Sequence, residues 1–380
     1  MIYFLSEEAP FRDAISRSSA SYVMVNIYGR RVALAWPDEM APRPVKGGTF
    51  MSIRRPYVLS SRDFKPDDTV VDVGGVSVGP GKLTVAAGPC SVEDGDELLE
   101  LGVSLRRAGA DMLRGGAFKP RTSPYSFLGL GEEGLRALAR AREELGLPVV
   151  SEVLDAASLP LYKDIDLMQV GTRNAQNFPL LQALGDLNKP VLLKRGMSNT
   201  VEEWLAASEY VLSRGNGSVV LCERGIRAPG TPTRFSLDVG AIPKVRRLSH
   251  LPICADPSHS AGDRDLVEPL ALAAVAAGAN MLLVEVHPHP ETALSDGDQQ
   301  ITPDAFALMM KKARALWELV NRTEVKERDE LEGRVRNRLR KDVGGGRTGR
   351  AGPVELVAGK EGGGISFSPR GRGHRAIARA

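Results

Sequence analysis

Short apolar runs recur at regular intervals through the middle of the chain. Eight of them are rich in Val, Leu or Ile, and each is too short to form a helix. They are LTVAAG (83–88), MLRGG (112–116), PVVSEV (148–153), LMQVGT (167–172), PVLLKR (190–195), SVVLCERG (218–225), PICADPS (252–258) and NMLLVEVHP (280–288). Such runs, apolar on both faces, are typical of parallel strands that are buried on both sides.

The segments between these runs have helical spacing. EEGLRALARAREELG (132–146) and TVEEWLAASEYVLSRG (200–215) place apolar residues three and four positions apart. Eight strand–helix units over about 240 residues predict an α/β fold, a closed (β/α)₈ TIM barrel. The alternative is a doubly wound open sheet, which usually has fewer strands and often a G-x-G-x-x-G first turn, a motif that is absent here.

Both ends of the chain differ from this repeating region. VVDVGGVSVGPG (70–81) predicts a small β-hairpin cap that turns at Gly74–Gly75 and plugs the N-terminal end of the barrel. Residues 1–65 form a short N-terminal extension with one alternating run, SYVMVNIYGRRVALAW, that turns at Gly29. Residues 66–322 are the predicted barrel. Residues 323–380 begin as a charged helix and continue as a Gly- and Arg-rich tail, for which we expect disorder.

Composition and charge narrow the range of functions. The chain is 42% hydrophobic and 26% charged, which is ordinary for a globular protein. It has neither an 18-residue apolar run nor a basic N-terminal leader, so we expect no membrane partner and no secretion. Three cysteines indicate a reducing, cytoplasmic location. The last 60 residues carry 15 Lys and Arg against 8 Asp and Glu, while the rest carries 35 against 39. A mildly acidic body argues against a nucleic-acid partner.

Active sites of such barrels form at the C-terminal ends of the strands. The second, fourth, fifth and sixth strand ends all carry basic residues. They are Arg114, Lys119 and Arg121, then Arg173, then Lys194 and Arg195, and finally Arg224 and Arg227. Arginine holds phosphate or carboxylate oxygens in pairs and lysine acts as a point charge, so this arrangement predicts a strongly anionic ligand.

A second group of residues has the chemistry of a metal site. Cys90 follows the first strand, His259 the seventh, and Glu285 and Asp296 lie at and after the eighth. The seventh, eighth and first strand ends are contiguous in a closed barrel, so these four side chains predict a site for one divalent metal ion. The mixture of soft and hard donors leaves Mn, Fe, Co, Zn and Cu open.

The remaining cysteines and histidines are expected to have other roles. Cys222 and Cys254 lie inside predicted strands and are expected to be buried small hydrophobes. We expect His250, beside a helix end, at the surface.

Seven motifs then identify a family. AGPCSVED, RGGAFKPRTSPYSFLGLG, QVGTRNAQN, KPVLLKRGMSNTVEEW, CERGIR, DPSHSAGDRDLV and VEVHPHPETALSDGDQQ closely resemble the type I beta group of 3-deoxy-D-arabino-heptulosonate 7-phosphate (DAHP) synthases, which includes the related KDO8P synthases. The resemblance extends from about Tyr57 to Trp317. It implies condensation of phosphoenolpyruvate with erythrose 4-phosphate, the first step of the shikimate pathway to chorismate and aromatic amino acids. It also implies a divalent metal and a homo-oligomer, a dimer or tetramer.

The resemblance assigns a role to each matching position. The metal ligands would be Cys90, His259, Glu285 and Asp296, and His259 would also be part of the catalytic set. Phosphoenolpyruvate would bind to Arg114, Lys119, Arg173, Lys194 and Arg224, and the phosphate of erythrose 4-phosphate to Arg121 and Thr122. Lys119 would deliver a proton to the new alkoxide, and Glu152 would orient a water molecule.

Three alternatives remain at this point. KDO8P synthase, which takes arabinose 5-phosphate, typically has a K-A-N-R-S loop where this chain has Pro120. A metal-dependent aldolase would need no second anion pocket, and a non-catalytic barrel would lack at least one of the four ligands. Many family members also carry a ferredoxin-like regulatory domain. Residues 1–56 show no two clear amphipathic helices, so the extension over 1–65 is at most a degenerate form of this domain.

Overall fold

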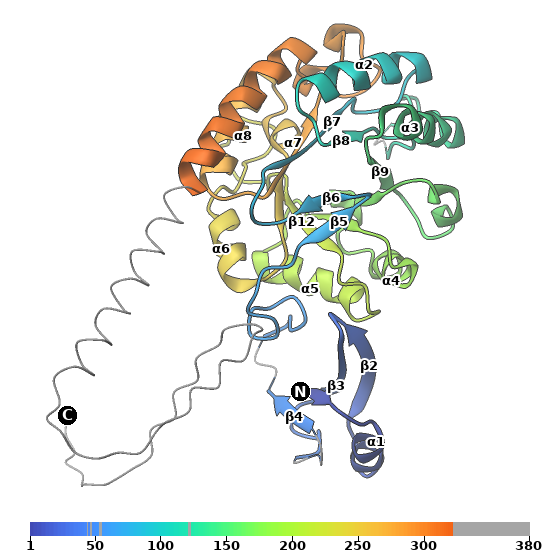
Figure 1. Ribbon diagram of the computed structural model, residues 1–380, viewed down its shortest axis with the longest axis vertical. Helices are drawn as coiled ribbons and strands as arrows, with labels where there is room; N and C mark the ends of the chain where they lie inside the picture. The colour runs from blue at the N-terminus through green and yellow to red at the C-terminus, as the bar shows by residue number, and fades with distance from the viewer. Residues whose placement is uncertain (44, 46–47, 53–54, 121–122, 322–380) are drawn as a thin grey trace, which may run out of the picture. The chain divides into compact units, whose positions relative to one another are not determined.

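The computed structural model describes residues 1–321, apart from 44, 46–47, 53–54 and 121–122. Eight parallel strands close into a barrel in which every strand pairs with two neighbours (Figure 1). They are β7 (Thr84–Gly88), β8 (Met112–Arg114), β9 (Val149–Val153), β10 (Leu167–Val170), β11 (Val191–Lys194), β12 (Val219–Glu223), β13 (Ile253–Ala255) and β14 (Met281–Glu285). Each lies within one of the eight apolar runs, so the predicted barrel is confirmed.

Helices surround the strands, as Figure 1 shows. They are α2 (Gly95–Arg107), α3 (Glu132–Leu145), α4 (Phe178–Leu187), α5 (Val201–Leu212), α6 (Ala241–Leu248), α7 (Pro257–Ala261), α8 (Val267–Ala276) and a last helix over 303–321. A short 3₁₀ helix, η1 (Leu159–Tyr162), takes the place of an α-helix between β9 and β10. The ends of the helices follow local chemistry. Thr200 and Glu203 form a capping box at the start of α5, and α3 ends at Gly146 in the left-handed region.

A hairpin packs into the barrel interior. β5 (Val71–Val73) and β6 (Val76–Val78) are joined by Gly74 and Gly75, both at positive φ, which suits glycine in a two-residue hairpin turn. Val71, Val73 and Val78 share one hydrophobic cluster with interior residues of the barrel strands, among them Met112, Val150 and Leu192. The predicted hairpin therefore plugs the barrel.

The N-terminal region forms a separate antiparallel sheet. Its elements are β1 (Ile2–Leu5), α1 (Ala9–Ser16), β2 (Ser21–Ile27), β3 (Arg30–Trp36) and β4 (Gly48–Met51), with strand order β2-β3-β1-β4. The predicted turn at Gly29 joins β2 and β3, where Ile27 pairs with Arg30. The elements follow one another as in a ferredoxin-like βαββαβ unit, except that the described residues between β3 and β4 contain no helix.

The structure also bears on the predictions for the remaining cysteines, for His250, for membrane spans and for the C-terminal tail. Cys222 and Cys254 are buried inside the barrel, as predicted. The prediction for His250 is wrong: its side chain is only 1% exposed. Among the described residues, no helix is both long and apolar enough to span a membrane. The predicted charged helix and tail over 323–380 lie outside the described residues.

Candidate active site

A cavity of about 300 Å³ opens at the C-terminal ends of the barrel strands. Seven of the residues singled out from the sequence line it: Lys119, Glu152, Arg173, Lys194, Arg224, His259 and Asp296. Cys90 and Glu285 are buried and contact this lining, and the buried Arg114 pairs with Glu285. Arg121 and Thr122 lie outside the described residues.

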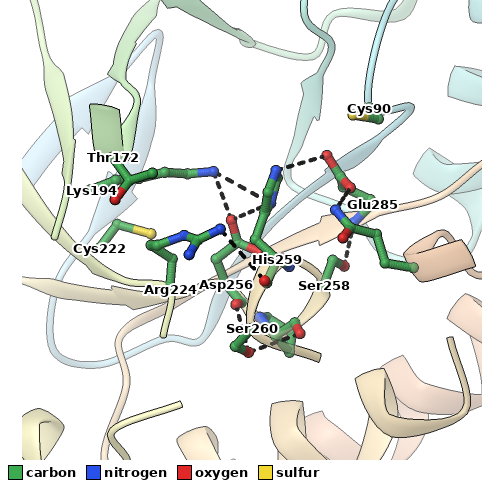
Figure 2. A network of polar contacts seen from close by, with 12 residues as sticks. Cys90, Thr172, Lys194, Cys222, Arg224, Asp256, Ser258, His259, Ser260 and Glu285 are labelled. Atoms are coloured by element: carbon green, nitrogen blue, oxygen red, sulfur yellow. Dashed lines mark hydrogen bonds and ion pairs between the residues drawn. The ribbon is translucent and has the colours of Figure 1, made fainter. Parts of the chain in front are cut away.

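Three of the four predicted metal donors converge. The thiol of Cys90, following β7, and the carboxylates of Glu285 and Asp296 offer ligand atoms that all lie within 4.8 Å of one another. Cys90 Sγ is 3.5 Å from Asp296 Oδ2. His259 is not a member of this group, but its Nε2 lies 3.5 Å from Glu285 Oε1, and Figure 2 shows the ring directed at that carboxylate. A thiol, an imidazole and two carboxylates are a suitable donor set for a divalent transition metal.

Charges around Glu285 favour the ionised form of its carboxylate. Burial would raise the pKa of Glu285, but His259, Arg114 and Lys119 outweigh it and lower that pKa to about 2. Burial raises the pKa of the Cys90 thiol to about 12, and Glu285 adds to the increase, although Lys119 Nζ lies 3.0 Å from the sulfur. Without a bound metal ion the thiol is thus protonated, and a bound metal would displace its proton.

Asp256 orients the imidazole of His259. Asp256 Oδ2 is 2.8 Å from His259 Nδ1 and 2.7 Å from Lys194 Nζ, and Oδ1 accepts from the backbone N–H of His259 at 2.9 Å (Figure 2). This ion-pair contact between Asp256 Oδ2 and Nδ1 holds the ring so that Nε2 faces Glu285. Asp256 belongs to the seventh apolar run (252–258), and no role was predicted for it from the sequence.

Buried cations line the other side of the cavity. Arg114 donates to Glu285 Oε1 and to Pro89 O, both at 2.8 Å, while the guanidinium of Arg224 lies over the Phe235 ring at 4.1 Å. The buried Nε atoms of Arg114 and Arg224 have no hydrogen-bond partner in the described part of the chain. Buried N–H groups of this kind usually have a partner, so an anionic ligand fits here.

Glu152 projects from β9 into the same cavity. Gln169 on β10 donates from Nε2 to Glu152 Oε2 at 3.1 Å. Gly171 leaves room for this carboxylate, because a Cβ at that position would lie 1.9 Å from Glu152 Oε1.

One expected cation is elsewhere, and several lining residues, among them Arg234 and Phe235, were not predicted. The interpretation of Arg195 as part of the basic mouth is wrong, because its buried guanidinium pairs with Glu223 at 2.8 Å and Asp238 at 3.0 Å. Arg234 and Phe235 line the cavity but were missed. They stand well beyond the end of β12, and the only available signal was another Arg in the loop that already carried Arg224 and Arg227.

Comparison with known proteins agrees with this geometry. A sequence profile of the DAHP synthetase I family matches residues 64–322. The chain belongs to this family. A phospho-2-dehydro-3-deoxyheptonate aldolase from Thermotoga maritima is 52% identical over 265 residues, which are 70% of this chain and 78% of that protein. A 2-dehydro-3-deoxyphosphooctonate aldolase from Geobacter sulfurreducens is 32% identical over 209 residues, 52% of this chain and 76% of that protein.

Solved structures of the DAHP synthetase I family lead to the same assignment. The crystal structure of phospho-2-dehydro-3-deoxyheptonate aldolase (DAHP synthase) from Thermotoga maritima has a TM-score of 0.70 and 43% identity, covering 84% of this chain and 97% of that one. A truncated 3-deoxy-D-arabino-heptulosonate 7-phosphate synthase from Thermotoga maritima has a TM-score of 0.66 and 47% identity, covering 70% and 98%. This chain is therefore an enzyme of the family, built on a (β/α)₈ barrel.

Proposed function

We propose that this enzyme is a 3-deoxy-7-phosphoheptulonate synthase. It condenses phosphoenolpyruvate with erythrose 4-phosphate, releases phosphate and performs the first step of the shikimate pathway. The observation that carries the proposal is a single cavity lined by buried cations and by donors suited to a divalent metal. Family membership and the 52% identical relative support it.

The cations supply the binding of phosphoenolpyruvate. Arg114, Lys119, Lys194 and Arg224 are nearly buried, so their charges are weakly screened and their attraction for phosphate and carboxylate oxygens is strong. Arg173 lines the more open side. Arg121 and Thr122 remain the proposed site for the phosphate of erythrose 4-phosphate, on the basis of the resemblance alone.

Proximity and proton transfer account for the chemistry. Two anions held side by side bring carbon 3 of phosphoenolpyruvate to the aldehyde carbon, and a new C–C bond forms there. Cys90, His259, Glu285 and Asp296 would hold one divalent metal ion, which supplies Lewis acidity at the aldehyde oxygen when bound. Carbon 2 then becomes cationic and water adds to it. Breaking of the C–O bond to the phosphoryl group finally releases inorganic phosphate.

Two side chains have proposed roles in these steps. Burial lowers the pKa of Lys119, but Cys90, Glu285 and Glu152 outweigh it and raise that pKa, so the ammonium group is protonated. Its Nζ lies 3.0 Å from Cys90 Sγ, beside the metal donors, where it can give a proton to the new alkoxide. Glu152 faces the same cavity and would orient the attacking water.

A phosphate-release assay tests the proposal. The purified chain should release phosphate from phosphoenolpyruvate only with erythrose 4-phosphate and divalent metal, and a chelator should abolish the activity. Cys90→Ala should bind metal poorly and lose metal-dependent turnover while keeping its circular dichroism spectrum. Faster turnover with arabinose 5-phosphate would instead identify a KDO8P synthase. Cleavage of an aldol substrate without phosphate release would identify an aldolase.

The proposal also covers the oligomeric state and the N-terminal region. We expect a cytoplasmic homo-oligomer, a dimer or tetramer, that acts on small phosphorylated substrates. Residues 1–65 would be a reduced ferredoxin-like regulatory domain, a proposal supported by the order of β1 to β4 and the single helix α1. Light scattering, and assays with added aromatic amino acids, test these two points.

A further inference from the structure

Two adjacent buried glutamines follow the predicted metal ligand Asp296. The 3₁₀ helix η5 (Gly297–Gln299) leads into Gln299 and Gln300, whose side chains are 1% and 0% exposed. The segment is held beside β14, because Ile301 N donates to Glu285 O and His287 N donates to Ile301 O, both at 3.1 Å. The backbone around Gln300 is therefore fixed relative to Glu285.

Gln299 binds the carboxylate of Glu285. Its Nε2 donates to Glu285 Oε2 at 2.5 Å, and its Oε1 accepts from Arg234 at 2.8 Å. Arg114 donates to the other oxygen, Oε1, at 2.8 Å, and His259 Nε2 lies 3.5 Å from it. Both oxygens of Glu285 are thus held in place, and the amide does so without adding a charge.

Gln300 joins the segments that carry the other two converging donors. Its Oε1 accepts from the backbone N–H of Cys90 at 2.9 Å, and its Nε2 donates to Ser295 O, next to Asp296, at 2.8 Å. A second tie links the same segments, because the hydroxyls of Ser91 and Ser295 lie 2.5 Å apart. The amide side chain provides separate acceptor and donor atoms at one end while remaining neutral.

We propose that Gln299 and Gln300 are positioning residues that set the geometry of the metal donors, Gln299 through Glu285 and Gln300 through Cys90 and the Asp296 segment. Gln300 has extended backbone angles, φ −85° and ψ 133°. Gln299 is the last residue of η5, and the change to extended backbone at Gln300 accompanies different partners for the two amides, Glu285 for Gln299 and Cys90 N–H for Gln300. Neither glutamine supplies a ligand. This inference rests on the metal centre proposed above.

Binding of Co²⁺ to the purified full chain tests the inference without measuring turnover. Gln300→Met keeps the volume and removes both hydrogen bonds, and it should lower Co²⁺ affinity in a chelator competition by roughly 10- to 100-fold. It should also change the thiolate-to-Co²⁺ absorption band, since Cys90 loses its support. Gln299→Met should lower affinity to a similar extent with the thiolate band retained, because its partner is Glu285.

Gln169→Met is the matched control. Gln169 is equally buried and donates to Glu152, which is not a proposed ligand, so Co²⁺ affinity should stay at the wild-type value. Gln300→Glu keeps an oxygen for Cys90 N–H and loses the donor to Ser295 O. It should also weaken binding, and it replaces Gln300→Met if that variant does not fold.

Wild-type affinity and an unchanged thiolate band in a folded Gln300 variant would overturn the role of Gln300. If neither Gln300 variant folds, wild-type affinity of Gln299→Met overturns the inference. Cys90→Ala distinguishes a failure of the proposed metal centre from a failure of the positioning roles. If Cys90→Ala binds Co²⁺ like the wild type, the metal centre itself is wrong. If Cys90→Ala loses binding while the glutamine variants keep it, only the positioning roles fail.

Discussion

At the strand ends, the direction in which a side chain points determines which partners it contacts. Lys194, the last residue of β11, reaches the cavity, whereas Arg195 pairs with Glu223 on another face. Successive side chains of a strand point to opposite faces, so two adjacent cations cannot both face the barrel mouth. The sequence showed both charges but not which of the two would be next to the substrate.

Gly171→Ala tests the role of Glu152 at this scale. The backbone of Gly171 is at φ −67°, which alanine adopts freely, so the new methyl group acts only by pushing the Glu152 carboxylate away. We expect turnover to fall by about 10-fold or more, since small misplacements of catalytic groups are costly. The unfolding temperature should change little, because a flexible side-chain end can move.

Gly95→Ala is the matched control for this change, because its new Cβ would meet only Ala137 Cβ at 3.4 Å. Both variants would be compared for kcat with the two substrates at saturation. If Gly171→Ala has the same kcat as Gly95→Ala, Glu152 takes no part in the reaction.

Phe235→Leu tests the cation–π contact with Arg224. Leucine keeps the apolar contact but removes the ring face 4.1 Å from the guanidinium. Such contacts contribute about 1–2 kcal/mol when desolvated, so KM for phosphoenolpyruvate should rise roughly 5- to 30-fold. Steady-state kinetics with each substrate varied in turn measure this change. An equal increase for the aldose phosphate would contradict a phosphoenolpyruvate subsite at Arg224.

At the scale of elements, packing in the loop between α6 and β13 determines the protonation state of His250. The residue lies between α6 and β13, where its Nε2 donates to Leu59 O at 2.7 Å and its Nδ1 accepts from Thr69 Oγ1 at 2.8 Å. Leu59 O can only accept, so the proton is on Nε2. Burial lowers the pKa of His250 to about 4, even though the bond to Leu59 raises it.

This lowered pKa predicts a stability change with pH. The unfolded chain binds a proton at pH 6.5 and the folded chain only near pH 4, so the stabilisation is complete above 6.5 and is lost as pH falls towards 4. The slope is up to about 1.4 kcal/mol per pH unit. Urea unfolding of the wild type and of His250→Gln should show a difference in free energy that shrinks across this window. A constant difference would mean that His250 does not titrate on unfolding.

At the scale of the molecule, barrel closure assembles the candidate metal centre. β14 pairs with β7, the last barrel strand with the first, and this brings Glu285 within reach of Cys90 although they are far apart in sequence. The neighbouring pair of β7 and β8 places Lys119, after β8, against the Cys90 sulfur. The donors therefore exist as a group only when the ring of strands is complete.

Metal binding should accordingly stabilise the whole fold. A ligand that binds only the folded state at 100 times its Kd stabilises it by about 2.7 kcal/mol, enough to raise Tm by several degrees. Differential scanning calorimetry with and without Co²⁺ should show this shift for the wild type and little of it for Cys90→Ala. Equal shifts for both proteins would place the ion at another site.

Periodicity was sufficient to predict the barrel, its hairpin plug and the strand ends that carry chemistry. The reason is that buried parallel strands require apolar residues at every position, and chain order then places their ends together. Only the folded chain decided which neighbours share a hydrogen bond. Asp256 beside His259, the two glutamines beside the metal donors and Phe235 beneath Arg224 depend on loop paths and side-chain direction. Asp256 and His259 are only three residues apart, but the contact of Gln300 with Cys90 joins segments that are distant in sequence, and periodicity specifies none of these pairings.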